Sequence, residues 1–364
     1  MNSVTAGIRS LYKVSTTQFL MILLAACATA VQAQQCPTGI GIFMTDTRQA
    51  RWQMDNYRLP ESEWVGNVTD PPCCIGPGCA GNCPCEDGHY CVYEYPKSSL
   101  VDTVQFLKDQ GISYTIVKIA DGERVTPQVR SQETTAAFAR VGMPVYGYHK
   151  LNASPGDKQA ATVIEAFKTW PELSGLVIMP GDSFYDLYGE GQGKLADEIA
   201  TQYVQTLQRE KGNGVLKGKV VLYAPEQGDS KDRRTAHIKF GKTLGDAVMP
   251  RTFWLKYTDY GTTDPMEPLY RRESEIRHIW GLRDPQDQSE WWIGRPLVLW
   301  AQTDMLVHGN RSRIKAFVER VKSESAGTEA VTPVKKYRQL QGLVIWEWAH
   351  MNRAEIDELA SIKW

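Results

Sequence analysis

The stretch from Tyr114 to Phe167 decides the fold, because it contains strand, helix, strand and helix in quick succession. Its first strand, Tyr114-Thr115-Ile116-Val117-Lys118-Ile119, is followed by the polar run Asp121-Gly122-Glu123. Its second strand, Val145-Tyr146-Gly147-Tyr148, is followed by His149-Lys150. Polar side chains at the C-terminal ends of parallel strands are where a (β/α)8 barrel builds its active site. The stretch therefore predicts an architecture and the place of the site within it.

Apolar runs of the same kind recur along the chain. The predicted strands are Ile40–Met44, Tyr114–Ile119, Val145–Tyr148, Leu176–Met179, Val220–Tyr223, Ala247–Met249, Leu297–Trp300 and Gly342–Ile345. These runs do not alternate with polar residues, as expected for strands that are buried on both faces. Strands that alternate with helices form a parallel sheet, and eight such units predict an α/β fold of the (β/α)8 TIM-barrel type. An open doubly wound sheet is the alternative, although no GxGxxG motif follows the first strand.

Segments with apolar residues at helical spacing lie between the strands. The clearest predicted helices extend from a Ser98 cap to Gly111, from Val129 to Arg140 before Gly142, from Asp157 to Trp170, from Leu195 to Lys211 and from Arg353 to Ile362. Weaker helical patterns cover 237–244, 269–280 and 314–321. The connection at about 47–97 is predicted as an irregular insertion after the first strand. We expect one barrel domain at 38–364 that includes this insertion.

The charge balance bears on the partners of the protein. The chain has 364 residues and a formal net charge of −1, so electrostatics do not indicate a nucleic-acid partner. The eleven Trp and sixteen Tyr residues suit stacking on sugars and equally suit an ordinary core. The sequence predicts no cofactor and no metal site, because it has no phosphate-binding fingerprint and no HExxH motif. It does not indicate an oligomeric state.

The N-terminus has the form of a secretory signal. Arg9 and Lys13 precede the apolar run Phe19–Ala26, which is too short to span a bilayer. Two processing routes fit: cleavage after Ala33, which makes 1–33 a signal peptide, or a lipoprotein signal that ends before Cys27. The protein is therefore expected to be secreted or periplasmic. Contact with a membrane is expected only through a lipid on Cys27.

Six cysteines are crowded into one short segment of the predicted insertion. They are Cys73, Cys74, Cys79, Cys83, Cys85 and Cys91, and Cys36 lies upstream. Disulfides persist outside the cytosol, so this cluster predicts a disulfide-stapled loop. A metal knuckle is the alternative, but the spacing matches no common zinc pattern. Under either processing route seven thiols remain for pairing, so one is left over, and the pairing stays open.

Two of the motifs resemble a known enzyme family. Ile116-Val117-Lys118-Ile119-Ala120-Asp121-Gly122 and Val145-Tyr146-Gly147-Tyr148-His149 are similar to the second and third strands of family-25 glycoside hydrolases, the lysozyme-type muramidases. The resemblance extends loosely from Ile40 to the C-terminus without the cysteine segment, and it implies a secreted barrel that hydrolyses glycosidic bonds. The family also carries Asp-x-Glu at the end of the fourth strand. This chain has Met179-Pro180-Gly181-Asp182-Ser183 there, so the expected acid is missing.

Glycoside hydrolysis needs one carboxylic acid that protonates the leaving oxygen and a second carboxylate that attacks the sugar or activates water. Asp182 and Glu226 follow adjacent strands and are the first predicted pair. Asp46 and Glu347 follow the first and last strands, which become neighbours when a barrel closes, and they are the second predicted pair. For each of these acids, a helix cap or a solvated loop acid is the alternative interpretation.

Other residues near the strand ends are candidates for substrate binding. They are Lys118, Asp121, Tyr148, His149, Arg251, Trp254, Trp346 and Trp348. The aromatic members predict a sugar-stacking platform, with a plug of the barrel mouth as the alternative. His149 is expected either to orient substrate or to be a satisfied histidine at the barrel rim.

The predicted partner is a polysaccharide or peptidoglycan substrate, and three function classes compete. The first is an active glycosidase. The second is a carbohydrate-binding barrel that has lost catalysis, which the missing Asp-x-Glu favours. The third is a GDSL-type esterase with Ser183 as nucleophile, although the Asp-x-x-His that such an enzyme needs is not found.

Overall fold

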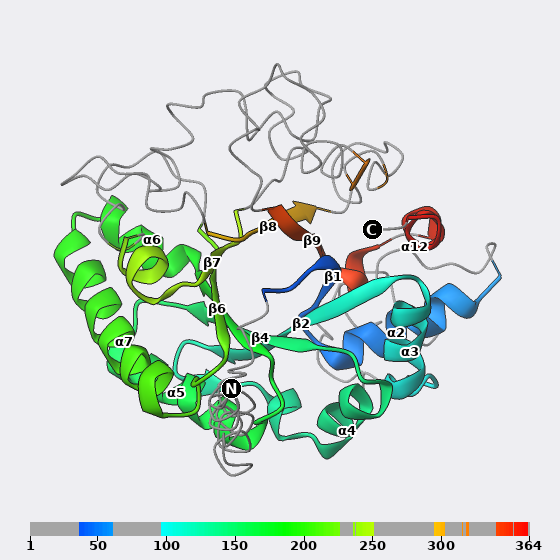
Figure 1. Cartoon of the computed structure of the whole chain (residues 1–364), viewed down its shortest axis with the longest axis horizontal. Helices are drawn as coiled ribbons and strands as arrows, with labels where there is room; N and C mark the ends of the chain where they lie inside the picture. Colours follow the sequence, from blue (N-terminus) through cyan, green and yellow to red (C-terminus); the bar gives the residue numbers. More distant parts are fainter. Residues whose placement is uncertain are drawn as a thin grey trace, which may run out of the picture. The chain divides into compact units, whose positions relative to one another are not determined.

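Eight parallel strands pair edge to edge into a closed barrel (Figure 1). The strands are β1 Gly39–Met44, β2 Ile112–Asp121, β4 Val145–Leu151, β5 Gly175–Pro180, β6 Val220–Tyr223, β7 Ala247–Val248, β8 Leu297–Gln302 and β9 Leu340–Trp346. The short strand β3, Arg124–Val125, runs antiparallel to β2. Closure is made by β1, in which Ile42 is aligned with Thr115 of β2 and with Ile345 of β9. The predicted barrel is confirmed.

This computed structural model describes residues 36–60, 96–225, 236, 238–250, 295–302, 315, 318–319, 340–351 and 353–362. They belong to one compact unit, Cys36–Trp364. The predicted signal segment and the crowded cysteines lie outside the described residues. Cys36 is described and is free. Among the described segments, no helix has both the length and the apolar character needed to cross a membrane.

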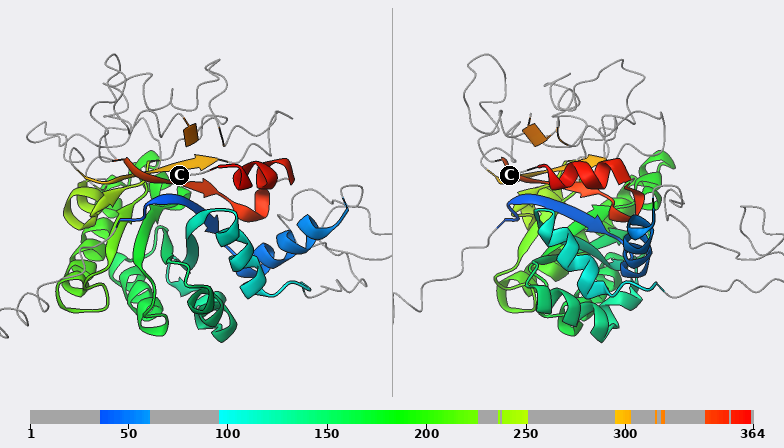
Figure 2. Two further views of the ribbon diagram at one scale, coloured as in Figure 1. Left: turned by 45° about the vertical axis from the view of Figure 1, so that its right-hand side comes forward. Right: turned by 90° about the vertical axis from the view of Figure 1, so that its right-hand side faces the viewer.

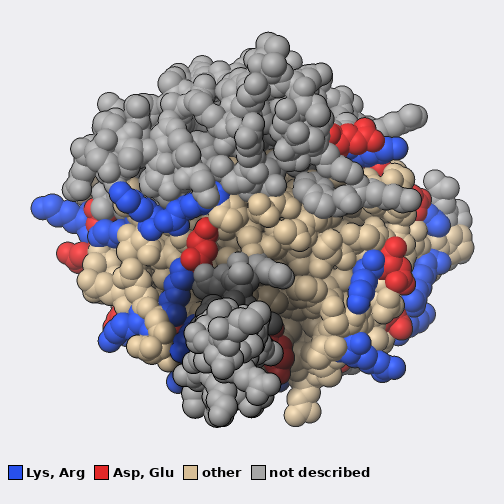
Figure 3. All heavy atoms as spheres, viewed as in Figure 1, with Lys and Arg blue, Asp and Glu red and all other residues tan. Residues whose placement is uncertain are grey.

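Helices cover the outside of the barrel. They are α2 Thr47–Arg58, α3 Leu100–Asp109, α4 Gln132–Val141, α5 Gly156–Thr169, α6 Asp182–Gly189, α7 Gly193–Asn213 and α12 Arg353–Ala360, with the 3-10 helices η2 Pro127–Arg130 and η7 Trp348–His350 and the π-helix η4 Ile238–Leu244. The turned views show the cyan and green helices α3 to α7 outside the strands (Figure 2). On the face drawn in Figure 3, basic and acidic side chains are interspersed over the described surface.

The local signals for helix ends act as predicted. The side chain of Ser99 accepts a hydrogen bond from the Asp102 amide and begins α3, one residue after the predicted Ser98 cap. Gly142 ends α4 in the left-handed region at φ 65°, where glycine has no steric penalty. The helices therefore begin and end close to the residues that the sequence indicates.

Two helices were not predicted from the sequence. Helix α2 occupies the beginning of the predicted irregular insertion, and the polar residues Gln53 and Asn56 lie on its buried face beside Ala50 and Met54. A helix that buries amides gives a weak apolar period, so the pattern was missed. Helix α6 begins at Asp182, where a catalytic loop was expected, and buries aromatic residues such as Phe184.

The core has two layers, one inside the barrel and one between the barrel and the helices. The inner layer includes Phe43, Tyr114, Tyr146, Tyr148 and Trp300, all at most 5% exposed. Successive side chains of a strand point to opposite faces, so each strand fills both layers. The bulky inner layer packs the barrel solidly and leaves its C-terminal end as the place for a site.

Candidate active site

Three neighbouring strands bring polar residues together at one end of the barrel. Glu347 follows β9, Asp46 follows β1, and Lys118 lies near the end of β2. Strand β1 lies between β9 and β2, so these residues belong to adjacent strand ends. Both Asp46 and Lys118 act electrostatically on Glu347. The structure thus brings the second predicted carboxylate pair to one place.

Glu347 is a buried acid. Its side chain is 2% exposed, and its Oε1 accepts a hydrogen bond from the Thr45 amide at 3.0 Å and another from the Thr45 hydroxyl. The pKa of Glu347 is raised from 4.5 to about 7, mainly by burial and in smaller part by the nearby charge of Asp46. The hydrogen bonds from Thr45 and the charge of Lys118 act in the opposite direction. Near neutral pH this carboxyl group is therefore poised to give up or take a proton.

Asp46 caps helix α2. Its Oδ1 accepts hydrogen bonds from the amides of Arg48 at 2.7 Å and Gln49 at 3.2 Å, and the residue is exposed. A carboxylate at a helix N-terminus is stabilised by the unpaired amides and by the helix dipole. The helix-cap interpretation of Asp46 is thus correct, and the same side chain lies within electrostatic reach of Glu347.

Lys118 and Asp121 form an ion pair beside the two acids. The side chain of Lys118 is 24% exposed and that of Asp121 is 45% exposed, so the pair borders solvent. The two residues were predicted as substrate-binding residues, and the structure places them in contact with each other. Their pairing holds the cation of Lys118 near the site.

Thr45 and Gln128 support the site and were not predicted. Gln128 donates to the carbonyl oxygens of Thr45, at 2.9 Å, and of Lys118. Its Oε1 accepts from the Thr47 amide at 3.1 Å. One buried amide side chain therefore connects the ends of β1 and β2. Thr45 had a signal in the sequence, because it directly precedes Asp46 at a strand end, whereas Gln128 had none.

The aromatic residues mostly fill the protein interior. Trp346 packs against Phe43, with ring centroids 4.9 Å apart, and against Trp300 at 5.3 Å, and it stays partly exposed. Tyr148 is 2% exposed inside the barrel. Trp348 is fully buried in the outer layer, where its Nε1 donates to the Ala50 carbonyl at 2.9 Å. Of these three described aromatic candidates, only Trp346 offers accessible surface for stacking.

His149 points away from the barrel interior. Its Nε2 lies 2.9 Å from the Gly122 carbonyl and its Nδ1 lies 2.9 Å from the Tyr203 hydroxyl. A carbonyl only accepts, so Nε2 carries the proton and Nδ1 accepts from Tyr203. Burial lowers the pKa of His149 from 6.5 to about 4, against the raising effects of the Gly122 bond and Asp121. His149 is a neutral, satisfied histidine packed against α7.

The first predicted pair is only half described. Asp182 is the first residue of α6 and is exposed, and Ser183, the alternative nucleophile, is the exposed residue after it. Glu226, Arg251 and Trp254 lie outside the described residues. The structure therefore places Asp46 within electrostatic reach of Glu347, and both carboxylate pairs stay predictions.

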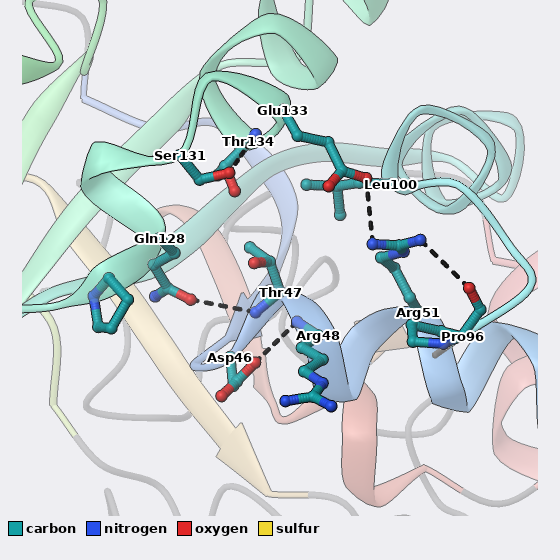
Figure 4. Close-up of a pocket in the computed structure, with 11 residues that line it drawn as sticks. Asp46, Thr47, Arg48, Arg51, Pro96, Leu100, Gln128, Ser131, Glu133 and Thr134 are labelled. Carbon is teal, nitrogen blue, oxygen red and sulfur yellow. Dashed lines mark hydrogen bonds and ion pairs between the residues drawn. The ribbon is translucent and has the colours of Figure 1, made fainter. Parts of the chain in front are cut away.

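A pocket of about 380 Å³ opens beside Asp46 (Figure 4). Its walls come from the first turns of α2, α3 and α4 and from η2. In Figure 4, Glu133 from α4 and Arg51 from α2 reach toward each other across it, and their ion pair measures 3.1 Å. Within the described part of the chain, no three His, Cys, Asp or Glu side chains are grouped so as to hold a metal ion.

No protein-family model matches the chain, and no curated protein sequence matches it either. Among solved structures, the chain is similar to a chitinase from Ipomoea carnea, with TM-score 0.39, 12% identity, and coverage of 89% of this chain and 97% of that one. It is similar to a class V chitinase from Nicotiana tobaccum, with TM-score 0.37, 14% identity, and coverage of 71% and 94%. It is also similar to phosphoribosyl anthranilate isomerase from Thermus thermophilus, with TM-score 0.33, 10% identity, and coverage of 72% and 92%. At these TM-scores the likenesses carry no functional argument, and the barrel assignment rests on the strand pairing itself.

The electrostatic coupling at the site predicts two shifts of opposite sign. Asp46→Asn is expected to lower the pKa of Glu347, because it removes a charge that raises this pKa while asparagine still caps α2. Lys118→Met is expected to raise it. Each shift should be below about one pH unit, because burial is the largest cause. Titration of the ¹³C-labelled carboxyl by NMR measures both, with Asp182→Asn as control. Shifts of the same sign in both variants would show that the two charges do not act on Glu347.

Proposed function

We propose that the protein is an exported glycoside hydrolase that cleaves glycosidic bonds in a polysaccharide or in peptidoglycan. Glu347 is the general acid and Asp46 is the second carboxylate. The observation that supports this most is the burial of Glu347 at a strand end, with a pKa of about 7, next to the exposed Asp46. The motif resemblance to lysozyme-type barrels agrees with this proposal.

The two acids have the unequal environments that the reaction needs. A proton donor must hold its proton near neutral pH, and burial gives Glu347 this property. The second carboxylate must be solvent-accessible and held in place, and Asp46 is exposed while the amides of Arg48 and Gln49 donate hydrogen bonds to its Oδ1. Protonation of the leaving oxygen by Glu347 and attack or water activation by Asp46 would complete the reaction. Thr45 holds the Glu347 carboxyl in position through Oε1.

A carbohydrate-binding barrel without catalysis is the second candidate. The observation that favours it is the small exposed fraction of Glu347, 2%, which limits contact with a glycosidic oxygen. In that case Trp346 and the polar rim would bind a sugar without cleaving it. Measured turnover separates the two candidates.

Turnover on peptidoglycan, chitin and aryl glycosides tests the proposal. Glu347→Gln is expected to lower kcat by about 10²- to 10⁴-fold, the usual contribution of a general acid. In the wild type, kcat/KM is expected to fall as the pH rises through about 7, because the proton donor is lost. Asp182→Asn and Ser183→Ala are expected to keep their activity.

Other outcomes assign a different function. Loss of activity on aryl esters in Ser183→Ala alone would identify the esterase. A wild type that binds sugar without turnover would identify the binding barrel. Full glycosidase activity in Glu347→Gln would overturn the assignment of the acid.

Export is part of the same proposal. It is supported by the apolar run Phe19–Ala26 and by the two predicted processing sites, after Ala33 and before Cys27. The mass of the protein recovered from its native host decides between the routes. Cleavage after Ala33 gives a chain beginning at Gln34, and lipoprotein processing gives a lipid on Cys27. Recovery of the full chain with Met1 would exclude both routes.

A further inference from the structure

We infer that the pocket between α2, α3 and α4 is a subsite that binds an uncharged sugar unit of the substrate. The inference rests on the proposed function, because it extends the Asp46–Glu347 centre sideways along the barrel rim. Three kinds of observation support it: the walls that the pocket shares with the centre, the balance of charge in it, and its mixed polar and apolar lining.

The pocket and the proposed catalytic centre share residues. Asp46 lines the pocket and acts electrostatically on Glu347. Gln128 also lines it and donates to the Thr45 carbonyl at 2.9 Å, while Thr45 donates to Glu347. A sugar chain whose scissile bond lies at the two acids would therefore have a neighbouring unit within reach of this pocket.

The charges in the pocket indicate a neutral ligand. Asp46 and Glu133 oppose Arg48 and Arg51, so the lining has no net charge. All three nitrogens of the Arg51 guanidinium are engaged: Nε donates to Ser98 O at 2.7 Å, Nη2 to Pro96 O at 3.2 Å, and Nη1 pairs with Glu133 at 3.1 Å. A carboxylate or a phosphate that clamps this guanidinium with two hydrogen bonds would have to compete with these partners.

Arg48 is held in a similar way. Its guanidinium carbon lies 4.7 Å from the centroid of the Trp52 ring, which is a cation–π geometry. An anionic ligand would have to compete with this contact and would also approach the carboxylates of Asp46 and Glu133. The charged groups that line the pocket therefore disfavour an anionic ligand.

The remaining lining suits a carbohydrate. The Glu133 side chain is 57% exposed, so its carboxylate can accept hydrogen bonds from the hydroxyl groups of a ligand. The exposed Pro127 adds apolar surface for the C–H face of a sugar ring, and the buried Pro96 and Leu100 also line the pocket. The volume of about 380 Å³ lies within the range of small-molecule sites, about 300–1,000 Å³.

Binding of neutral tetrasaccharides to the Glu347→Gln protein tests the inference without hydrolysis. We expect chitotetraose or cellotetraose to bind in calorimetry and to shift the NMR signals of the Leu100 and Thr134 methyl groups. Adding Glu133→Gln is expected to weaken binding about tenfold, because a charge-assisted hydrogen bond is lost. Glu165→Gln is the matched control, since Glu165 also pairs with an arginine, Arg130 at 2.6 Å, but lies outside the pocket.

Several results would overturn the inference. Tighter binding of tetragalacturonate than of chitotetraose or cellotetraose would show that the pocket is an anion site. Equal affinities in the Glu133→Gln and Glu165→Gln proteins would show that Glu133 does not take part in binding. If neither neutral tetrasaccharide binds, uncharged sugars are excluded as the ligand class. Methyl shifts at Leu100 together with full turnover in Glu347→Gln would keep the pocket and refute the proposed acid. Lost turnover in Glu347→Gln without methyl shifts at Leu100 would support the proposed acid and refute the pocket as a subsite.

Discussion

Gly156→Ala is expected to destabilise the protein by about 3 kcal/mol, as measured by urea unfolding, because it forces two helices apart. A Cβ at this position would lie 2.0 Å from the Ile199 carbonyl oxygen and 2.8 Å from the Tyr203 amide nitrogen. Both atoms belong to the backbone of α7, so no side-chain rotation relieves the clash. Helix α5 would have to move away from α7.

Gly212→Ala is the matched control within α7. Apart from the chain neighbours and the nearby backbone of α7 itself, no atom lies within 4 Å of a Cβ added there, so the substitution is expected only to improve helix propensity. The free energy of unfolding should rise by up to about 1 kcal/mol.

The clash also makes a specific local prediction, because Tyr203 donates to His149. In Gly156→Ala the pKa of His149 should shift, and in Gly212→Ala it should not. Equal stabilities of the two variants would show that α5 and α7 are not closely packed.

The second expected result is that the stability advantage of the wild type over Glu347→Gln falls as the pH rises. The pKa of Glu347 is about 7 in the folded protein, whereas a solvated glutamate has a pKa of 4.5, so the folded state binds the proton more tightly. Its contribution is fully present below pH 4.5 and is lost as the pH rises through about 7. The difference between the two pKa values corresponds to a change on the order of 3 kcal/mol in the free energy of unfolding.

His149 has the opposite dependence. Its pKa is about 4 in the folded protein against 6.5 for a solvated imidazole, so its contribution is present above pH 6.5 and is lost as the pH falls toward 4. Between pH 4.5 and 6.5 the two effects offset each other in the wild type. In Glu347→Gln the rise of stability with pH that is due to His149 should therefore become visible.

Urea unfolding of both proteins at several pH values between 4.5 and 8 measures this difference. Glu165→Gln serves as control, because this exposed acid pairs with Arg130 on the surface, and its difference from the wild type should change little with pH. A difference between wild type and Glu347→Gln that stays constant from pH 4.5 to 8 would show that Glu347 is not a buried, protonated acid.

Much of the fold could be predicted from local patterns. The strands that begin at Val145 and Val220 were predicted at their first residue, because unbroken apolar runs are typical of strands buried on both faces. Helix α2 could not be predicted in this way. It buries Gln53, whose amide donates to the Met351 carbonyl, and that partner lies far away in the sequence. A tertiary hydrogen bond replaces the apolar contact that a periodic pattern would have shown.

The site was predicted less completely, because adjacent residues at a strand end point to opposite faces. Tyr148 and His149 were both expected at the barrel mouth. Tyr148 lies in the barrel interior, whereas His149 packs against Tyr203 of α7. Sequence proximity placed them together, and the pleat of the strand separates them.

The sequence by itself determined the alternation of strands and helices, the helix end at Gly142, the beginning of α3 to within one residue, and the neighbourhood of Asp46 and Glu347. Each of these follows from local chemistry or from the closure of an eight-stranded ring. Only the tertiary structure decided that Glu347 is buried, that Thr45 holds it and that Gln128 connects β1 with β2. The physical reason is that a pKa depends on desolvation and on nearby charges, which residues distant in the chain supply once the barrel has closed.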